Sequence, residues 1–359
     1  MQRALCFDDV LLVPQYSEVE SRSLVDLSVT GFDDPDARLT SLHLPLKCPI
    51  VGSPMDTVIS PAAAAVLEDV GGFGVLHRYC TIEESVRMFQ DAASRCPGHP
   101  LPNIMVAVGA TGDYLERTTA LYEAGCRAFC IDVAHGHHAS MKKALKELRT
   151  KFGNDIHIMT GNVATLEAFN DLADWGSNSI RVGVGGGSMC STRIRTGHGV
   201  PTLQSIIDCA KSDRDVFLVA DGGIRNAGDA VKALAAGADL LMLGSILAGH
   251  DESPGDVVDD KGLVYKTTQP IGIPLFKKFR GMASREAQLQ WRGRVSVVEG
   301  EVTMVPYKGK MINTIADLLE GVKSGVSYSG AMTIRELRSK ARFITVTAQG
   351  VRENGPHGK

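Results

Sequence analysis

The stretch that decides the fold is residues 180–201, IRVGVGGGSMCSTRIRTGHGVP. A short apolar strand ends here in a run of glycines, and the first reactive side chain after them is Cys190, which lies among hydroxyl residues. Glycines permit positive φ angles and let the backbone approach a ligand closely, so this loop is suited to ligand contact rather than to packing. The alternative interpretation is a flexible turn that contains an incidental core cysteine.

The same pattern of an apolar strand, a polar loop and an amphipathic helical stretch recurs along the chain. The eight predicted strands are 49–52, 74–76, 104–108, 128–131, 157–159, 180–182, 216–220 and 240–243. Apolar strands that alternate with helices predict a parallel sheet buried on both faces, and eight of them predict a closed (β/α)8 TIM barrel. An open doubly wound sheet is the alternative, but no G-x-G-x-x-G leads from the first strand into a helix.

Barrels of this kind carry their sites at the carboxyl ends of the strands. In this chain, polar or glycine-rich segments follow six of the predicted strands, at 53–56, 132–138, 161–162, 183–193, 221–223 and 244–245. We therefore expect a single site at that end of the barrel.

The remaining segments are read as additions to one catalytic domain over 1–359. Residues 1–48, with a polar loop at 32–38, are predicted to form an N-terminal arm. Residues 250–310 are too long for an ordinary connection and are predicted to be a lid after the eighth strand. Helices are expected at 312–324 and 333–341, followed by a polar, exposed tail from residue 346.

Composition narrows the classes of partner and compartment. The formal net charge of −3 offers no broad basic surface for nucleic acid or an acidic membrane, so we expect neither partner. The eight cysteines show no C-x-x-C or other zinc spacing, which is typical of reduced thiols in a cytosolic protein. The first residues lack an apolar signal region and no apolar run reaches membrane-spanning length, so the expected location is cytoplasmic.

Two glycine-containing loops predict a phosphate site. Gly222 and Gly223 follow the seventh strand, and Gly244 and Ser245 follow the eighth, where barrels commonly present backbone N–H groups to a phosphate. Asp221 stands next to this cradle and could accept hydrogen bonds from both hydroxyls of a ribose. The alternative is that Asp-Gly-Gly is merely a turn.

Cys190 is the candidate nucleophile. N–H dipoles or Arg193 would favour its thiolate, and the attack would be on an electrophilic carbon. Thr192, two residues further on, could pass a proton. His135, His137 and His138 lie in one loop without a distant set of further ligands, so an exposed polar loop is the favoured interpretation over a metal site.

Together these motifs resemble the inosine monophosphate dehydrogenase and guanosine monophosphate reductase superfamily over nearly the whole chain. The resemblance rests on segments 7–14 (FDDVLLVP), 53–58 (SPMDTV), 161–163 (GNV), 187–193 (GSMCSTR), 220–225 (ADGGIR), 252–255 (ESPG) and 281–284 (GMAS). It implies that Cys190 attacks C2 of a purine nucleoside monophosphate while hydride moves between C2 and a nicotinamide.

The resemblance also implies a role for each matching position. The nucleotide would be held by Ser53, Met55, Ser188, Asp221, Gly222, Gly223, Gly244, Ser245, Gly281, Met282 and Ala283, with Asp221 on the ribose and Met282 at the base. Asp132, Asn162 and Arg181 would lie around the nicotinamide and the covalent intermediate. Backbone carbonyls of Gly185, Gly187 and Cys190 match positions that hold a monovalent cation, so potassium is expected, as is a homotetramer.

The lid separates the two branches of this superfamily. Dehydrogenases hydrolyse their thioimidate with an Arg-Tyr pair on a long flap, whereas residues 281–299 are short and contain no such pair. The regulatory tandem domain that usually follows the second strand of dehydrogenases is also missing, since His77-Arg78-Tyr79-Cys80 leads straight into the next helix.

These features favour a GMP reductase that uses NADPH to convert GMP to IMP and ammonia, with Thr192 and Glu299 activating the amine. Phe279 and Ser296 depart from the residues that dehydrogenases and reductases, respectively, carry there. An IMP dehydrogenase that uses NAD, which segments 220–225 and 252–255 resemble, stays open as the alternative. So does a purine nucleotide-binding protein without turnover, or a flavin-binding barrel.

Overall fold

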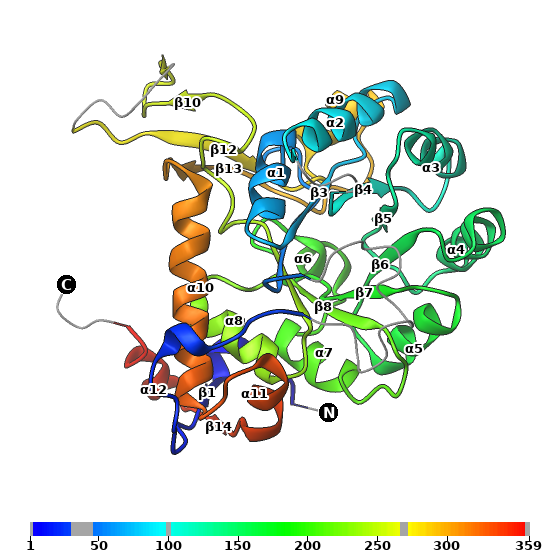
Figure 1. Cartoon of the computed structure of the whole chain (residues 1–359). Coiled ribbons are helices and arrows are strands. Elements are labelled where there is room, and N and C mark those ends of the chain that lie inside the picture. The colour runs from blue at the N-terminus through cyan, green and yellow to red at the C-terminus, as the bar shows by residue number, and fades with distance from the viewer. Residues whose placement is uncertain (1–2, 30–45, 98–101, 266–271, 356–359) are drawn as a thin grey trace.

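The computed structural model describes residues 3–29, 46–97, 102–265 and 272–355, and every structural statement below refers to these residues. The polar loop expected at 32–38 lies outside them. Figure 1 shows a barrel surrounded by helices, a sheet that projects from one end beside α10 (Met311–Tyr328), and both terminal segments at the other end of that helix.

Eight parallel strands close the barrel in the order of the chain. They are β2 (Ile50–Gly52), β3 (Phe73–Leu76), β4 (Ile104–Val108), β5 (Ala128–Ile131), β6 (His157–Val163), β7 (Ser179–Val182), β8 (Phe217–Asp221) and β9 (Leu240–Leu243). Closure is made where Ile50 of β2 pairs with Leu241 of β9. The (β/α)8 prediction and each of the eight predicted strands are confirmed.

The strands form because their residues are apolar on both faces. Every residue of β3, β4, β5 and β9 is buried, with one face inside the barrel and the other beneath the helices. The surrounding helices are α1 (Pro61–Asp69), α2 (Ile82–Ser94), α3 (Tyr114–Glu123), α4 (Ala139–Phe152), α5 (Leu166–Asp174), α7 (Thr202–Cys209) and α8 (Ala227–Ala235).

Local capping sets where several of these helices begin. Thr81 and Glu84 form a capping box at α2, in which the Thr81 hydroxyl accepts from the Glu84 N–H and the Glu84 carboxylate accepts from the Thr81 N–H. This box starts α2 immediately after residues 77–80, so the chain passes from β3 to its helix by a short connection.

The segment predicted to be a lid contains ordered structure that its composition did not indicate. Strands β10 (Val257–Val258), β11 (Val264–Tyr265), β12 (Phe276–Arg280) and β13 (Val302–Pro306) form an antiparallel sheet in the order β11-β10-β12-β13. Helix α9 (Arg285–Arg292) and a following loop lie between β12 and β13 in the chain. The hairpin of β12 and β13 therefore carries this helix and loop back to the mouth of the barrel.

The chain ends join each other through β1 (Val10–Leu12) and β14 (Phe343–Thr345), which pair antiparallel. Helices α10 and α11 (Ile334–Lys340) confirm the two helices expected near the end of the chain. The expected exposed tail is confirmed for its described residues, most of which are exposed and none buried, although it also contains α12 (Ala348–Arg352) and Val346 donates a backbone hydrogen bond to the Asp9 carbonyl at 2.9 Å. Among the described residues no helix is both long and apolar enough to cross a membrane.

A buried histidine links the barrel to acid sensitivity. His157 of β6 is buried, its Nε2 pairs with the Ser179 hydroxyl at 2.9 Å, and its Nδ1 has no partner. Burial, with a smaller effect of Arg149, lowers the pKa of His157 to about 3. Below pH 6.5 the unfolded chain therefore binds a proton at His157 that the native state does not bind. The free energy of unfolding thus has its full value above that pH and falls as the pH drops.

We expect His157→Gln to remove this acid sensitivity. Between pH 6.5 and 5 the histidine should cost the wild-type protein about 2 kcal/mol of unfolding free energy. Urea unfolding of both proteins at pH 7.5 and pH 5 measures the difference. Equal losses in the two proteins would contradict the assignment.

Candidate active site

A cavity of about 430 Å³ opens at the carboxyl ends of the barrel strands. Loops after β2, β7, β8 and β9 line it, and the segment between β12 and β13 covers it from the side of the lid. The structure brings together in its wall all of the residues predicted to be catalytic or to hold the nucleotide: Ser53, Met55, Ser188, Cys190, Thr192, Asp221, Gly222, Gly223, Gly244, Ser245, Gly281, Met282, Ala283 and Glu299.

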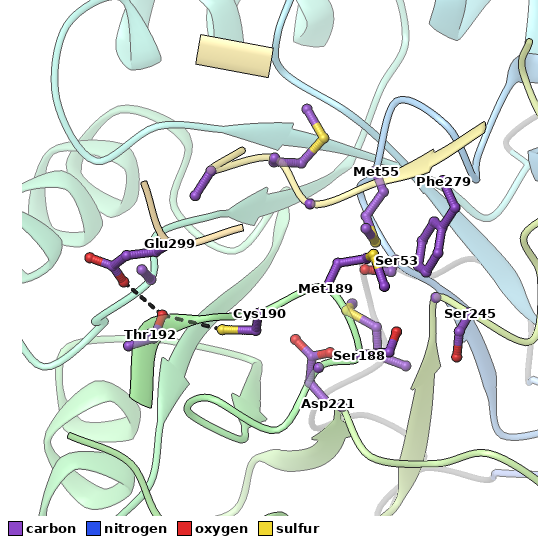
Figure 2. Close-up of a pocket in the computed structure, with 18 of the residues that line it drawn as sticks. Ser53, Met55, Ser188, Met189, Cys190, Thr192, Asp221, Ser245, Phe279 and Glu299 are labelled. Carbon is purple, nitrogen blue, oxygen red and sulfur yellow. Dashed lines mark hydrogen bonds between the residues drawn. The ribbon is translucent and has the colours of Figure 1, made fainter. Parts of the chain in front are cut away.

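Cys190 begins a hydrogen-bonded chain that ends on a carboxylate of the lid. Its thiol donates to the Thr192 hydroxyl, with Sγ and Oγ1 3.2 Å apart, and Thr192 donates to Glu299 Oε2 at 2.6 Å. Figure 2 shows these three side chains in line, with Asp221 on the other side of Cys190 in this view. A proton can thus leave the exposed thiol for a carboxylate through one hydroxyl.

The backbone holds this arrangement in place. Cys190 and Gly300 form an isolated antiparallel bridge, and the Ser191 N–H donates to the Glu299 carbonyl at 2.9 Å. Glu301 donates in the same way to the Met189 carbonyl at 3.0 Å. The lid segment and the cysteine loop therefore pair like two short strands, and this pairing sets the position of Glu299.

The predicted phosphate cradle depends on close approach between the backbones of the Gly222 and Gly187 loops. Gly222 has φ +92°, and a Cβ there would lie 2.8 Å from the Gly187 nitrogen, so a larger residue would collide with the cysteine loop. Gly223 has φ +83°. Only glycine adopts such angles without strain, and its bare backbone leaves the N–H groups of both loops accessible to an anion.

Asp221 ends β8 at the centre of a polar network. The Asn162 amide donates to Asp221 Oδ2 and to the Gly183 carbonyl, both at 2.8 Å, and the buried Arg181 guanidinium lies 3.5 Å from the same carboxylate. Burial raises the pKa of Asp221, and Arg181 and the Asn162 hydrogen bond oppose that rise. Its carboxylate is thus oriented towards the cavity by groups behind it.

The residues expected around the nicotinamide lie in that network rather than in the cavity wall. Arg181 donates to Asp132 Oδ1 at 2.8 Å, and Asp132 also faces Arg78 at 3.9 Å. Ala134, two residues after Asp132, does line the cavity. Asp132, Asn162 and Arg181 therefore form one network with Asp221, and none of the three is among the described residues that line the cavity.

The carbonyls expected to hold a monovalent cation meet that requirement only in part. Carbonyl oxygens suit a hard cation, yet the Gly187 carbonyl already accepts the Cys190 N–H at 3.0 Å. Arg193 packs against Gly185 and donates to the Val200 carbonyl at 2.7 Å, which places a positive charge beside the loop. The three carbonyls leave most of a cation's coordination to other groups.

Two histidines of the β5 loop, His137 and His138, make local contacts. His137 Nε2 lies 2.8 Å from the Asp171 carboxylate, and His138 Nδ1 accepts from the Ser140 N–H at 3.1 Å as the cap of α4. The structure does not gather three or more metal-binding side chains anywhere in the described ranges.

Sequence reasoning did not assign a role to several lid residues that line the cavity. Gln288 of α9 is buried, donates to the Ala283 and Val297 carbonyls at 3.0 and 2.9 Å, and accepts from the Ser296 N–H at 2.8 Å. Arg292 of the lid also lines the cavity, as does Tyr79 from the connection after β3. The available signal in the sequence was a glutamine on the apolar side of an amphipathic helix. It could not identify the partners of Gln288, because they lie outside that helix.

One buried arginine joins the lid to the barrel. Arg280 forms an ion pair with Asp56, also buried, in the loop after β2, and its main-chain N–H donates to the Thr57 hydroxyl at 3.1 Å. On the lid side it donates to Glu286 and Gln290 of α9 at 2.8 and 2.7 Å. Arg280 therefore fixes α9 relative to the Ser53–Met55 wall of the cavity.

A closed parallel barrel with an exposed thiol, a carboxylate and two glycine-containing loops around one cavity at its carboxyl end defines a (β/α)8 protein with a single main site. The sequence pattern of the IMP dehydrogenase / GMP reductase domain matches residues 4–357. The chain belongs to the IMP dehydrogenase / GMP reductase family.

Relatives of both branches match nearly the full chain. An inosine-5'-monophosphate dehydrogenase of Nitrosopumilus maritimus is 30% identical, with 99% of this chain and 98% of that protein covered. Human GMP reductase 1 is 36% identical, with 96% of each chain covered. A crystal structure of GMP reductase from Trypanosoma brucei in complex with guanosine 5'-monophosphate superimposes with a TM-score of 0.87 at 28% identity, covering 100% of this chain and 98% of that one.

The cradle geometry predicts a difference between two glycine substitutions. Gly222 and Gly255 have nearly equal φ angles of +92° and +93°, but a Cβ at Gly255 meets nothing within 4 Å. We expect Gly255→Ala to cost about 1–2 kcal/mol from backbone strain alone, and Gly222→Ala to cost more because of the clash with Gly187. Denaturant unfolding of both variants measures the gap, and equal stabilities would contradict the close approach.

Proposed function

We propose that this protein is a GMP reductase, which converts GMP, NADPH and a proton to IMP, NADP⁺ and ammonia. The observation that carries the proposal is the hydrogen-bonded series Cys190–Thr192–Glu299. Its last member belongs to the lid, which is short between Gly281 and Glu299. That segment is α9 and one loop, and it has no Arg-Tyr pair to activate water. A reaction that replaces an amine by hydride needs proton transfer to the amine but no hydrolysis.

The nucleotide would bind across the barrel mouth. Its phosphate would meet the N–H groups of the Gly222–Gly223 and Gly244–Ser245 loops, together with Ser188, and its ribose hydroxyls would donate to Asp221. Met55 and Met282 line the wall where the base would lie, and the Met282 sulfur accepts from the Asp56 N–H at 3.4 Å. This pose directs C2 of the purine towards Cys190.

Proton transfer would run along the observed hydrogen bonds. Glu299, through Thr192, takes the thiol proton as Cys190 Sγ bonds to C2, and the same pair returns a proton to the departing amine. Loss of ammonia leaves the purine joined to Cys190 by a C–S bond. Reduction at C2 then releases IMP and regenerates the thiolate.

The cofactor supplies the hydride in that last step. The chain has groups that fit a nicotinamide dinucleotide: Asp132 is partly exposed next to the cavity wall, and Arg181 has a buried Nε without a hydrogen-bond partner. Asp132, Asn162 and Arg181 would then hold the nicotinamide end. NADPH rather than NAD is the proposed cofactor because the reaction is reductive.

An IMP dehydrogenase is the second candidate, and the relative from Nitrosopumilus maritimus favours it. That reaction requires a base that activates water after hydride has left C2. Among the described residues that line the cavity, Arg292 is the one arginine. The residue after it is Gly293 rather than a tyrosine, so it does not form an Arg-Tyr pair. A binding protein without turnover would have no need for the Thr192–Glu299 pair beside an exposed thiol.

Assembly, cation and compartment complete the proposal. We propose a homotetramer, supported by apolar side chains such as Leu263 and Met304 that the projecting sheet exposes at 60% and 44%; sedimentation velocity measures its mass.

Potassium remains proposed as the bound cation, and replacing it by tetramethylammonium in the assay tests that proposal. A single catalytic domain and a cytoplasmic location, suggested by the free cysteines, are proposed as well.

Absorbance at the reduced nicotinamide band tests the reaction. We expect NADPH to be consumed with GMP while an equal amount of ammonia is released. Formation of NADH from IMP and NAD, without the first reaction, would identify a dehydrogenase instead. Cys190→Ala should abolish turnover in either direction, and activity in that variant would exclude the covalent mechanism.

Glu299→Gln should lower kcat by about 10²–10⁴-fold, because the amide cannot accept the proton that Thr192 relays. Glu301→Gln is the matched control, since it lies two residues away on the same segment and its exposed side chain lies outside the cavity wall. Its kcat should stay near that of the wild type. A similar loss in both variants would mean that the lid segment, rather than the Glu299 carboxylate, had been disturbed.

A further inference from the structure

The cavity wall carries more acidic than basic side chains. Its acidic residues are Asp221 and Glu299, and Arg292 is the only lysine or arginine among the described residues that line it. Both reactants of the proposed reaction carry phosphate. The cradle would meet one phosphate with backbone N–H groups, which leaves the Arg292 guanidinium as the one full positive charge among the described residues of the wall.

The backbone of Arg292 is held firmly while its side chain is free. Arg292 is the last residue of α9, and Gly293 ends the helix with φ +64° and an N–H bond to the Leu289 carbonyl at 3.1 Å. Arg280 and Gln288 fasten the same helix to the barrel and to the rest of the lid. Within the described ranges, however, Arg292 forms no hydrogen bond or ion pair and is exposed.

Arg292 acts on the side of the cavity away from the phosphate cradle. The ring of Trp291, the preceding residue of α9, lies 6.3 Å from the ring of His77, which directly follows β3. Tyr79, two residues after His77, lines the cavity with Arg292, whose charge offsets part of the effect by which burial raises the pKa of that phenol. Ala134 follows β5 on the same side. In a closed eight-stranded barrel β3–β5 lie across the axis from β7–β9, whose loops make the cradle.

This separation decides which reactant Arg292 meets. A nucleotide with its phosphate in the cradle and its base at Cys190 fills the β7–β9 side, so the second reactant must enter from the β3–β5 side. We infer that Arg292 is a specificity-determining residue that binds a phosphoryl group of the dinucleotide cofactor. The inference rests on the proposed function in taking a nicotinamide dinucleotide as the second reactant.

A nicotinamide dinucleotide can offer Arg292 either of two anionic phosphoryl groups. The diphosphate bridge occurs in both NADH and NADPH, whereas the 2'-phosphate occurs only in NADPH. A guanidinium can form paired hydrogen bonds with either group. Kinetics with both cofactors distinguish them, because loss of a bond to the bridge weakens both cofactors and loss of a bond to the 2'-phosphate weakens one.

The test uses Arg292→Met, which removes the charge and keeps a long helix-forming side chain. At saturating GMP we expect the KM for NADPH to rise about tenfold or more, with little change in kcat, since a binding contact common to ground and transition states is lost. An equal rise for NADH identifies the diphosphate bridge, and no rise for NADH identifies the 2'-phosphate. Arg292→Lys should recover part of the affinity.

Arg294→Met is the control, because Arg294 is an exposed arginine two residues away that does not line the cavity. Its KM values should equal those of the wild type. The inference is overturned if Arg292→Met leaves both cofactor KM values unchanged, or if it raises the KM for GMP instead.

Direct titration separates this inference from the proposed function. Calorimetry with NADP⁺ and with NAD⁺, in the absence of GMP, measures binding to the wild-type and Arg292→Met proteins without any turnover. Weaker binding by the variant supports the role of Arg292 even if the wild type fails to reduce GMP. Equal binding by the two proteins contradicts that role even if GMP reduction is observed.

Discussion

The active site depends on the pairing between the cysteine loop and the returning end of the lid. Backbone hydrogen bonds of Ser191 with Glu299, and of Met189 with Glu301, make the two segments behave as neighbouring strands. The cysteine loop is glycine-rich, and residues 293–299 of the lid form no helix or strand of their own. Their mutual hydrogen bonds position the Thr192 hydroxyl and the Glu299 carboxylate 2.6 Å apart, so the reactive chain exists only when the lid is docked.

Buried ion pairs hold both partners of that pairing in register with the barrel. Arg280 and Asp56 tie β12 to the loop after β2, and Arg181 lies between Asp132 and Asp221 beneath the cavity. Removal of one partner from a buried pair leaves an uncompensated charge, at a cost of about 3–5 kcal/mol. These contacts therefore restrict the lid and the Asp221 carboxylate to one arrangement, which suits a site that must align a thiol, a hydroxyl and a carboxylate.

Much of the barrel and the site was predictable because it is encoded locally. Each strand is a short apolar run that ends in polar or glycine residues, and the cradle residues Gly222, Gly223, Gly244 and Ser245 directly follow strands. The prediction was incomplete where partners are remote. The strands β10–β13 were not expected, because their pairing partners lie outside each short segment, and the tail contained α12 and a bond to Asp9.

By itself, the sequence determined the eight-fold strand pattern, the order of the loops at the barrel mouth and the chemical types of the reactive groups. These follow from hydrophobic periodicity and from residues adjacent in the chain. Only the tertiary structure decided that Glu299 reaches Thr192 across 107 positions, that Asp132 and Arg181 stand behind Asp221, and that Arg292 faces the cavity. Such contacts are made between elements that meet only when the barrel has closed and the lid has folded back onto it. The glycine loop after β7 thus supplies the thiol, and the fold brings Thr192 and Glu299 into hydrogen-bonding distance of each other beside it.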